Sequence, residues 1–224
     1  MQHASAIILF ARTAEAEGKE KNLLQRSGKS NENALRLLRN HAIAVIKASQ
    51  IPYFIFSEEE QVGESFAAKI TNAYQQVFDL GYQRIICIGA DVPSITSKDL
   101  INADRLLQQE DVVCGPTQCG GSYLLGINKA VFNKYVFLGL AWQTSNLFRD
   151  ITNKFAHCAV TNELPELNTA EQLLALKNSS TKLVGISTQL LHLVNSILLN
   201  TIETLLSHFL YGNYTLVRRP ARAP

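Results

Sequence analysis

The sequence lacks the motifs that mark several common classes of nucleotide-binding and metal-binding protein. It contains no GxxxxGK[ST] and no GxGxxG, so neither a P-loop nor a Rossmann dinucleotide site is expected. Its four cysteines form no CxxC pair and no histidine stands at metal-ligand spacing, which argues against zinc. Internal repeats and low-complexity tracts are missing as well. The chemistry of this chain must therefore come from other residues.

Charge is also sparse: charged residues make up 18% of the chain and the formal net charge is +2. No basic run inside the fold could follow a phosphate backbone, so no nucleic-acid partner is expected. The one arginine cluster, Arg218, Arg219 and Arg222, lies in the tail, where we expect it to be solvated. The first apolar run, residues 6–11, is too short for a signal peptide. Buried-type cysteines within apolar runs fit a reducing compartment, and we expect a cytoplasmic protein.

Short apolar runs rich in β-branched residues alternate with segments of helical periodicity. Strands are expected at 6–11, 53–56, 85–88 and 111–114, and helices at 31–49, 63–80 and 97–109. Ser30 or Asn31 is available as the N-cap of the first helix. Further along, the sequence predicts strands at 122–127 and 155–160 and helices at 129–137 and 169–177. This alternation predicts an α/β fold with a doubly wound, mostly parallel sheet flanked by helices.

The C-terminal part has a different character. A polar break at 178–182 precedes a long helical pattern over residues 187–211, so we expect a main domain at 1–180 and an extension at 181–224. Polar residues interrupt the apolar positions of that helix, and no membrane span is expected. A broad apolar face of this kind is typical of a helix that docks on its own domain or on a second copy in a homodimer.

Asp91 is the first candidate for chemistry. It directly follows the apolar run 85–88, and Pro93 keeps the next helix from starting early, so the carboxylate should lie at the edge of the sheet. Mg²⁺ usually binds one or two carboxylates together with substrate phosphates, and a single acid in this place is adequate for it. The alternative is a loop aspartate that only caps a turn or the coming helix.

Two further segments accompany this aspartate. The pair Gly120-Gly121, followed by Ser122 and Tyr123, allows close approach of a ligand to the backbone, although a tight hairpin would have the same sequence. The loop after the first strand contains Gly18, Lys19 and Lys21, which suit a nucleotide diphosphate. Glutamates at 15, 17 and 20 dilute that positive charge, so a solvated loop is the alternative.

Taken together, these segments resemble the DUF2064 family, which includes arsenosugar-type glycosyltransferases and has the GT-A nucleotide-diphospho-sugar transferase fold. The family shows G-x-x-K-T-R-L, G-S-D-x-P, D-x-V-x-G-P-x-x-D-G-G-Y-Y-L-x-G, a W-S/T-T element and a late D-x-D-T. The corresponding stretches here read ILFARTAEAEGKEKNLL, IGADVPSIT, DVVCGPTQCGGSYLLG, LAWQTSNLF and PELNTAEQL. The match in order and spacing spans residues 6–177.

The resemblance implies a sugar-nucleotide-dependent glycosyltransferase with a divalent cation, Mg²⁺ or Mn²⁺, on the diphosphate. Asp91 would hold the metal, with Tyr123 as a second catalytic residue. The residues implied to contact the nucleotide are Arg12, Gly18, Lys19 and Lys21. Those implied to line the sugar or acceptor side are Gly120, Gly121, Ser122 and Trp142, although Trp142 would suit the core equally well.

The chain also departs from the family pattern. Arg12 stands where the family has lysine, and Asn22 and Leu23 replace the threonine and arginine of K-T-R-L. The other departures are Cys119 for an aspartate, Ser122 for a tyrosine, and Glu166 and Asn168 for the late aspartates. Several acidic or phosphate-binding positions are therefore lost.

Two other functions stay open on the sequence. A nucleotidyltransferase of the same broad fold would attack the α-phosphate of a nucleoside triphosphate, but the loop AEAEGKEKN lacks the richer G-G-x-S-x-R-M-G pattern of such enzymes. A non-catalytic relative that binds nucleotide weakly is supported by the substitutions at Leu23, Cys119 and Asn168.

Overall fold

The computed structural model describes residues 4–23, 28–169 and 172. The helix predicted for 187–211, most of the helix predicted for 169–177, the homodimer contact and the domain division at 180 lie outside the described residues. Within those residues, no helix combines the length and the apolar character that crossing a membrane requires.

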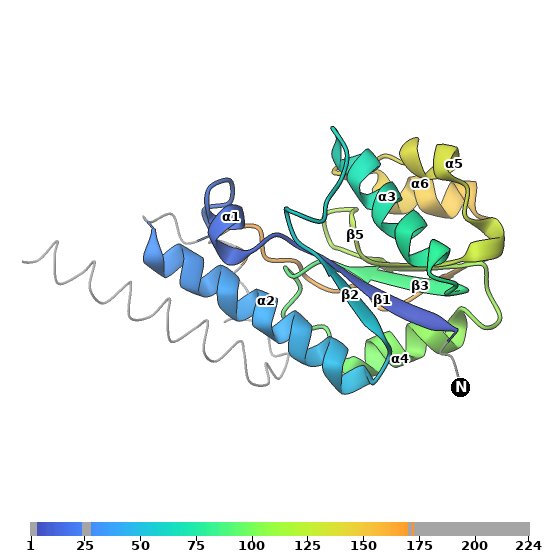
Figure 1. Cartoon of the computed structure of the whole chain (residues 1–224), viewed down its shortest axis with the longest axis horizontal. Coiled ribbons are helices and arrows are strands. Elements are labelled where there is room, and N and C mark those ends of the chain that lie inside the picture. The colour runs from blue at the N-terminus through green and yellow to red at the C-terminus, as the bar shows by residue number, and fades with distance from the viewer. Residues whose placement is uncertain (1–3, 24–27, 170–171, 173–224) are drawn as a thin grey trace, which may run out of the picture.

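A six-stranded sheet forms the centre of the fold, with the strand order β2-β1-β3-β5-β4-β6 (Figure 1). Its strands are β1 Ser5–Phe10, β2 Tyr53–Phe56, β3 Arg84–Ile88, β4 Val112–Pro116, β5 Ser122–Asn128 and β6 Cys158–Val160. All strands except β5 run in one direction, because β1 pairs in parallel with β2 and β3, and β4 pairs in parallel with β6. The predicted α/β class with a mostly parallel sheet is confirmed.

Strand β5 is the one antiparallel strand among the six that the structure describes. It lies between β3 and β4 and is antiparallel to both, so β4 and β5 form a hairpin. The sequence predicted the strand at 122–127 but not its direction. The Gly120-Gly121 pair therefore lies in the turn of a hairpin, as one of its two interpretations required.

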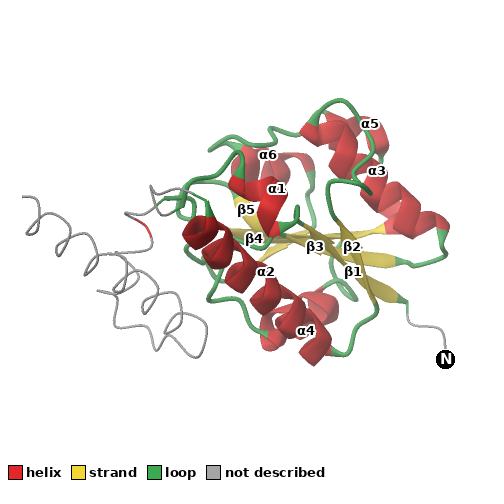
Figure 2. Ribbon diagram, turned by 60° about the vertical axis from the view of Figure 1, so that its left-hand side comes forward, coloured by secondary structure: helices red, strands yellow, loops and turns green. Residues whose placement is uncertain are grey.

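Helices cover both faces of the sheet, with α2 (Lys29–Ser49) and α4 (Ser97–Leu106) on one face and α3 (Phe66–Asp79), α5 (Lys134–Leu138) and α6 (Leu147–Lys154) on the other (Figures 1 and 2). Alternate residues of each central strand enter opposite layers. In β1, Ile8 packs in the core under α3, whereas Ile7 and Leu9 pack in the core under α2 and α4. The layers are those of a doubly wound sheet.

The helix boundaries follow from capping and periodicity, with some differences from prediction. The first predicted helix has six apolar residues at helical spacing, and all six are buried in α2: Ala34, Leu35, Leu38, Ala42, Val45 and Ile46. The helix begins at Lys29, and Asn31 lies inside its first turn. Helix α3 begins at Phe66, where the Ser65 hydroxyl accepts from the Ala68 N–H, rather than at residue 63.

The elements of the second half differ more from prediction. The predicted helix at 129–137 divides into a 3₁₀ turn, Lys129–Val131, and α5. The last strand is shorter than predicted. Helices α1 (Ala14–Gly18) and α6 were not predicted.

Candidate functional site

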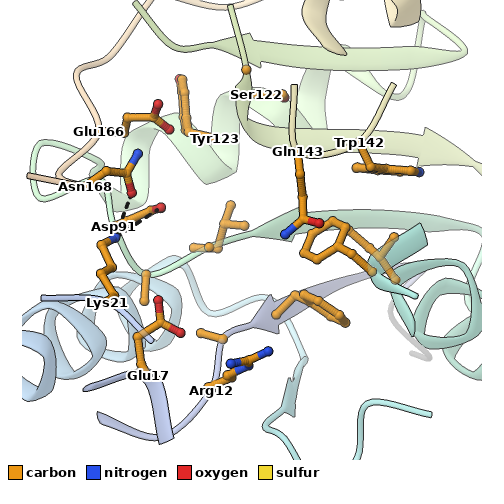
Figure 3. A pocket seen from close by; sticks show the side chains of 18 of the residues that line it. Arg12, Glu17, Lys21, Asp91, Ser122, Tyr123, Trp142, Gln143, Glu166 and Asn168 are labelled. Carbon is orange, nitrogen blue, oxygen red and sulfur yellow. Dashed lines mark hydrogen bonds and ion pairs between the residues drawn. The ribbon is translucent and has the colours of Figure 1, made fainter. Parts of the chain in front are cut away.

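A pocket of about 860 Å³ opens at the carboxyl ends of β1 and β3. Side chains from the loops that follow these strands, from the β4–β5 hairpin and from residues 166–168 line it (Figure 3). The carboxyl end of parallel strands is where α/β sheets usually bind ligands. The pocket therefore coincides with the edge of the sheet that the sequence indicated.

Asp91 reaches the pocket because the chain turns tightly after β3. A Cβ added at Gly89 would lie 3.0 Å from the Asp91 Oδ1 atom, so a glycine keeps this carboxylate close to the strand end. Val92 and Ile95 are buried and anchor the loop. The Asp99 carboxylate caps the start of α4 by accepting from the Thr96 N–H at 2.8 Å. The Asp91 carboxylate, 37% exposed, is thus free of the capping role that the alternative interpretation gave it.

Lys21 reaches the same place from the loop after β1. Its N–H donates to the Glu17 carbonyl at 2.8 Å, and its carbonyl accepts from the Asn31 side chain at 2.7 Å. Leu23 is fully buried. This explains an apolar residue where the resemblance has arginine, because Leu23 anchors the loop in the core.

The third component is a segment that we call the strap, residues 161–168. It leaves β6, runs beside β4 and reaches the loop after β3, and three backbone hydrogen bonds fix this course. The donors are Thr161, Leu164 and Leu167, and the acceptors are the carbonyls of Cys114, Pro116 and Asp91, at 3.0, 3.1 and 2.7 Å. The strap thereby carries Glu166 and Asn168 to the pocket.

The three components meet at the Lys21 ammonium (Figure 3). Lys21 Nζ lies 2.8 Å from Asn168 Oδ1 and 3.9 Å from Asp91 Oδ2. Two oxygens from different segments therefore converge on one cationic group. Sequence reasoning singled out Asp91 and Lys21, but it treated Asn168 only as a lost acidic position.

A divalent cation can be tested against this donor set. The described part of the chain contains no group of three His, Cys, Asp or Glu side chains that could hold a metal. Asp91 and Asn168 offer only hard oxygen atoms, which suit Mg²⁺ or Mn²⁺. The set fits a cation that takes its remaining ligands from phosphate and water, and it does not fit one held by protein alone.

The glycine pair of the hairpin divides into two roles. Gly120 has φ +79°, and an added Cβ would lie 2.1 Å from the Ser145 carbonyl oxygen, so this residue is required by backbone packing. Gly121 lines the pocket, and its N–H donates to the Thr117 hydroxyl at 3.1 Å. Ser122 also lines the pocket, but its hydroxyl donates to the Leu124 carbonyl.

Tyr123 lines the pocket with a side chain that is almost entirely buried. Its hydroxyl lies 3.0 Å from the Thr161 hydroxyl and donates to the Asn162 carbonyl at 3.2 Å. Burial raises the pKa of the phenol above its ordinary value, so it stays protonated at neutral pH. In this geometry Tyr123 holds the strap in place.

Trp142 packs against the core and also lines the pocket. Its indole N–H donates to the Phe137 carbonyl at 2.7 Å, and its ring packs against Phe66 and Phe137 with centroids 5.8 and 5.4 Å away. The same side chain is part of the pocket wall. A residue packed against the core thus also borders the site.

The other predicted positions differ in their placement. Arg12 lines the pocket and is paired with Glu20, whose hydrogen bond raises the pKa of the guanidinium. Gly18 ends α1, Lys19 is exposed, and neither of them lines the pocket. Cys119 lies at the rim, where burial and then the neighbouring Glu166 carboxylate raise the pKa of its thiol.

Sequence reasoning missed several pocket residues, among them three polar ones. Arg39 projects from α2, Lys69 from α3 and Gln143 from the loop after Trp142. Arg39 occupies a position of α2 next to the buried Leu38, and only its position on the helix could have indicated it. Gln143 has φ +58°, which no local motif signals.

This chain is similar in sequence to one protein family and in structure to several solved proteins. Residues 32–144 match the model of the family described as "Uncharacterized protein conserved in bacteria (DUF2064)". A solved structure from Desulfovibrio desulfuricans G20, named a "putative nucleotide-diphospho-sugar transferase", is 22% identical, with a TM-score of 0.74. The alignment covers 87% of this chain and 98% of that one.

A second structure, the Rv0371c homologue from Mycobacterium sp. strain JC1, is 12% identical with a TM-score of 0.50. The alignment covers 79% of this chain and 96% of that one. No curated protein matches the sequence. At these identities the two structures establish the fold alone, which is the nucleotide-diphospho-sugar transferase fold that the resemblance implied.

Proposed function

The chain belongs to the DUF2064 family, and from this premise we propose that it transfers a sugar from a nucleoside diphosphate to an acceptor. The observation that carries the proposal is the convergence of Asp91, Lys21 and Asn168 at the carboxyl ends of β1 and β3. An ammonium and two hard oxygens at this edge suit a diphosphate and its counter-cation. The protein is expected to be cytoplasmic.

In this proposal Asp91 and Asn168 would hold a Mg²⁺ or Mn²⁺ ion that arrives with the diphosphate. When bound, such an ion stabilises the negative charge that builds on the leaving nucleoside diphosphate. Lys21 contributes a second positive charge to the same phosphates. Arg12, across the pocket, neutralises charge farther from the reacting bond.

The hairpin and the aromatic wall position the rest of the donor. Gly121 lines the pocket and has no side chain, which would let a sugar approach its backbone closely. Trp142 presents an apolar ring face, the surface on which sugars commonly stack. Tyr123 fixes the strap, and through it Asn168, and we assign it a positioning role.

A second candidate is a relative that binds a nucleotide diphosphate without turning it over. The observation that favours it is the hairpin turn, where Cys119 replaces an acid and the raised pKa keeps its thiol protonated. No carboxylate of this turn is then available as a base for an acceptor hydroxyl. Glu166, which lies beside Cys119, is the carboxylate that could take that role in the transferase.

Thermal unfolding with UDP-, GDP- and dTDP-sugars, each with and without Mn²⁺, tests the site. We expect a metal-dependent rise in Tm with at least one of them, since a ligand at 100 times its Kd stabilises by about 2.7 kcal/mol. Asp91→Asn should abolish the rise. Asp79→Asn, at an exposed carboxylate that lies outside the pocket, is the matched control. No shift with any nucleotide would contradict the proposal, and a shift without product formation would favour the non-catalytic candidate.

A further inference from the structure

We propose that Lys21 is a placeholder cation, which occupies Asp91 and Asn168 in the free protein and excludes a divalent ion until a diphosphate draws the ammonium away. Metal and diphosphate would then bind only together. This inference rests on the proposed function, because it concerns how the same site is filled.

The geometry of the free site carries the first step. Lys21 Nζ donates to Asn168 Oδ1 at 2.8 Å and lies within 3.9 Å of Asp91 Oδ2 (Figure 3). These are the oxygens that a divalent ion would have to use. A metal ion bound to either of them would lie within a few ångströms of the ammonium, and at such distances like charges repel strongly. The free protein therefore favours the lysine over the metal.

The second step is that the lysine is fixed at its backbone but not at its tip. The Lys21 N–H and carbonyl are both bonded, to Glu17 and to the buried Asn31, and Leu23 anchors the chain two residues on. Four side-chain torsions lie between this anchored backbone and the ammonium. The Lys21 side chain is 15% exposed and borders the pocket, so its tip can turn toward a ligand without moving the loop.

The oxygen partner is also held in place. The Asn168 N–H donates to the Gln172 side chain at 2.6 Å, and the preceding residue, Leu167, is fully buried and bonded to the Asp91 carbonyl. Withdrawal of the ammonium would therefore leave the backbone of Asp91 and Asn168 in place, with their side-chain oxygens uncovered. These oxygens would then be available to a second cation.

A diphosphate supplies the driving force for the exchange. Its oxygens form stronger, charge-assisted bonds with an ammonium than the neutral Asn168 amide does. When the ammonium leaves, the Asp91 carboxylate loses its positive neighbour. A divalent ion that binds both the phosphate and Asp91 replaces that positive charge. The Lys21 ammonium and the metal thus occupy the same site one after the other. This exchange couples metal binding to nucleotide binding.

Binding of Mn²⁺, followed through the electron paramagnetic resonance signal of the free ion, tests the inference. The full chain, Lys21→Met and Lys21→Gln are titrated with Mn²⁺ alone and then with Mn²⁺ and UDP, GDP or dTDP. Lys47→Met, at an exposed lysine of α2 outside the pocket, is the matched control. Circular dichroism checks that each variant is folded.

For Mn²⁺ alone, we expect both Lys21 variants to bind about tenfold more tightly than the wild type and the Lys47→Met control, a coupling within the usual range. In the wild type a nucleoside diphosphate should strengthen Mn²⁺ binding, and this synergy should shrink in the Lys21 variants. If the wild type shows the synergy but the variants bind Mn²⁺ alone no more tightly, the placeholder role is refuted and the proposed function stands. If no variant binds Mn²⁺ under any condition, both the inference and the metal role of Asp91 are refuted.

Discussion

The backbone N–H of Leu167 donates to the carbonyl of Asp91 at 2.7 Å, and this bond joins the strap to the loop after β3. The two segments are 76 positions apart in the sequence, as their residue numbers show. Leu167 is fully buried, so the bond is sheltered from water. The candidate ligands Asp91 and Asn168 therefore belong to one rigid unit, although they lie far apart along the chain.

The hairpin turn offers the sharpest stability prediction. Gly120→Ala should destabilise the protein by about 2–4 kcal/mol, because a positive φ and a Cβ placed against the Ser145 carbonyl oxygen both oppose the substitution. Gly121→Ala is the matched control and should cost less, since its new Cβ would meet only the Thr117 hydroxyl at 3.1 Å. Urea unfolding measures both. Equal losses for the two variants would contradict the division of roles within the pair.

The role of Tyr123 in holding the strap can be tested by removing its hydroxyl oxygen. Tyr123→Phe should destabilise the fold by about 1 kcal/mol, since the bonds to Thr161 and Asn162 are lost from a buried phenol. Tyr135→Phe, at a tyrosine that is 74% exposed, should change stability by less than about 0.5 kcal/mol. Urea unfolding again gives the comparison. Loss of nucleotide binding with unchanged stability would show instead that the phenol contacts the ligand.

The only tryptophan of the chain gives a spectroscopic readout of the pocket. Because Trp142 lines the pocket, its emission should change saturably when a nucleotide sugar binds, after correction for the absorbance of the base. The free nucleoside, which has no phosphates, should produce little change at the same concentration. Thermal stabilisation without any change in emission would place the ligand away from this wall.

Buried thiols predict how stability depends on pH. Burial raises the pKa of Cys87 and of Cys114 to about 12, whereas the same thiols titrate near pH 9 in the unfolded chain. Above pH 9 the unfolded state loses protons that the folded state retains, so stability should be complete below pH 9 and fall as the pH rises toward 12. The double variant Cys87→Ala, Cys114→Ala should show a shallower fall. An unchanged slope in urea unfolding between pH 9 and 11 would contradict this assignment.

Local patterns were sufficient for most of the elements. The apolar positions of α2 repeat every three or four residues, and all six that the sequence indicated are buried. The pairing of β5 was not predictable in this way. Its short apolar run fits a strand in either direction, and its place between β3 and β4 depends on pairing with β3, which lies more than 30 residues earlier in the sequence.

The candidate site was only partly predictable, because some of its residues meet through contacts between segments that are distant in the sequence. Asp91 follows a buried strand and Lys21 follows another, so both could be placed at the same edge of the sheet. Asn168 could not, because it reaches Lys21 only through the course of the strap from β6 along β4 to the loop after β3. Gly120 was placed in the right turn, but its contact with the Ser145 backbone, 25 residues further along, was not predictable from local sequence.

A crystal structure with a nucleotide sugar and Mn²⁺ would show whether Asp91 binds the metal, because anomalous scattering locates Mn²⁺ directly. We expect a Mn²⁺ ion bound to an Asp91 carboxylate oxygen and to the diphosphate, with the Lys21 ammonium moved from Asn168 onto a phosphate oxygen. A diphosphate bound elsewhere, or one bound here with no metal beside Asp91 and with Lys21 still on Asn168, would contradict this expectation.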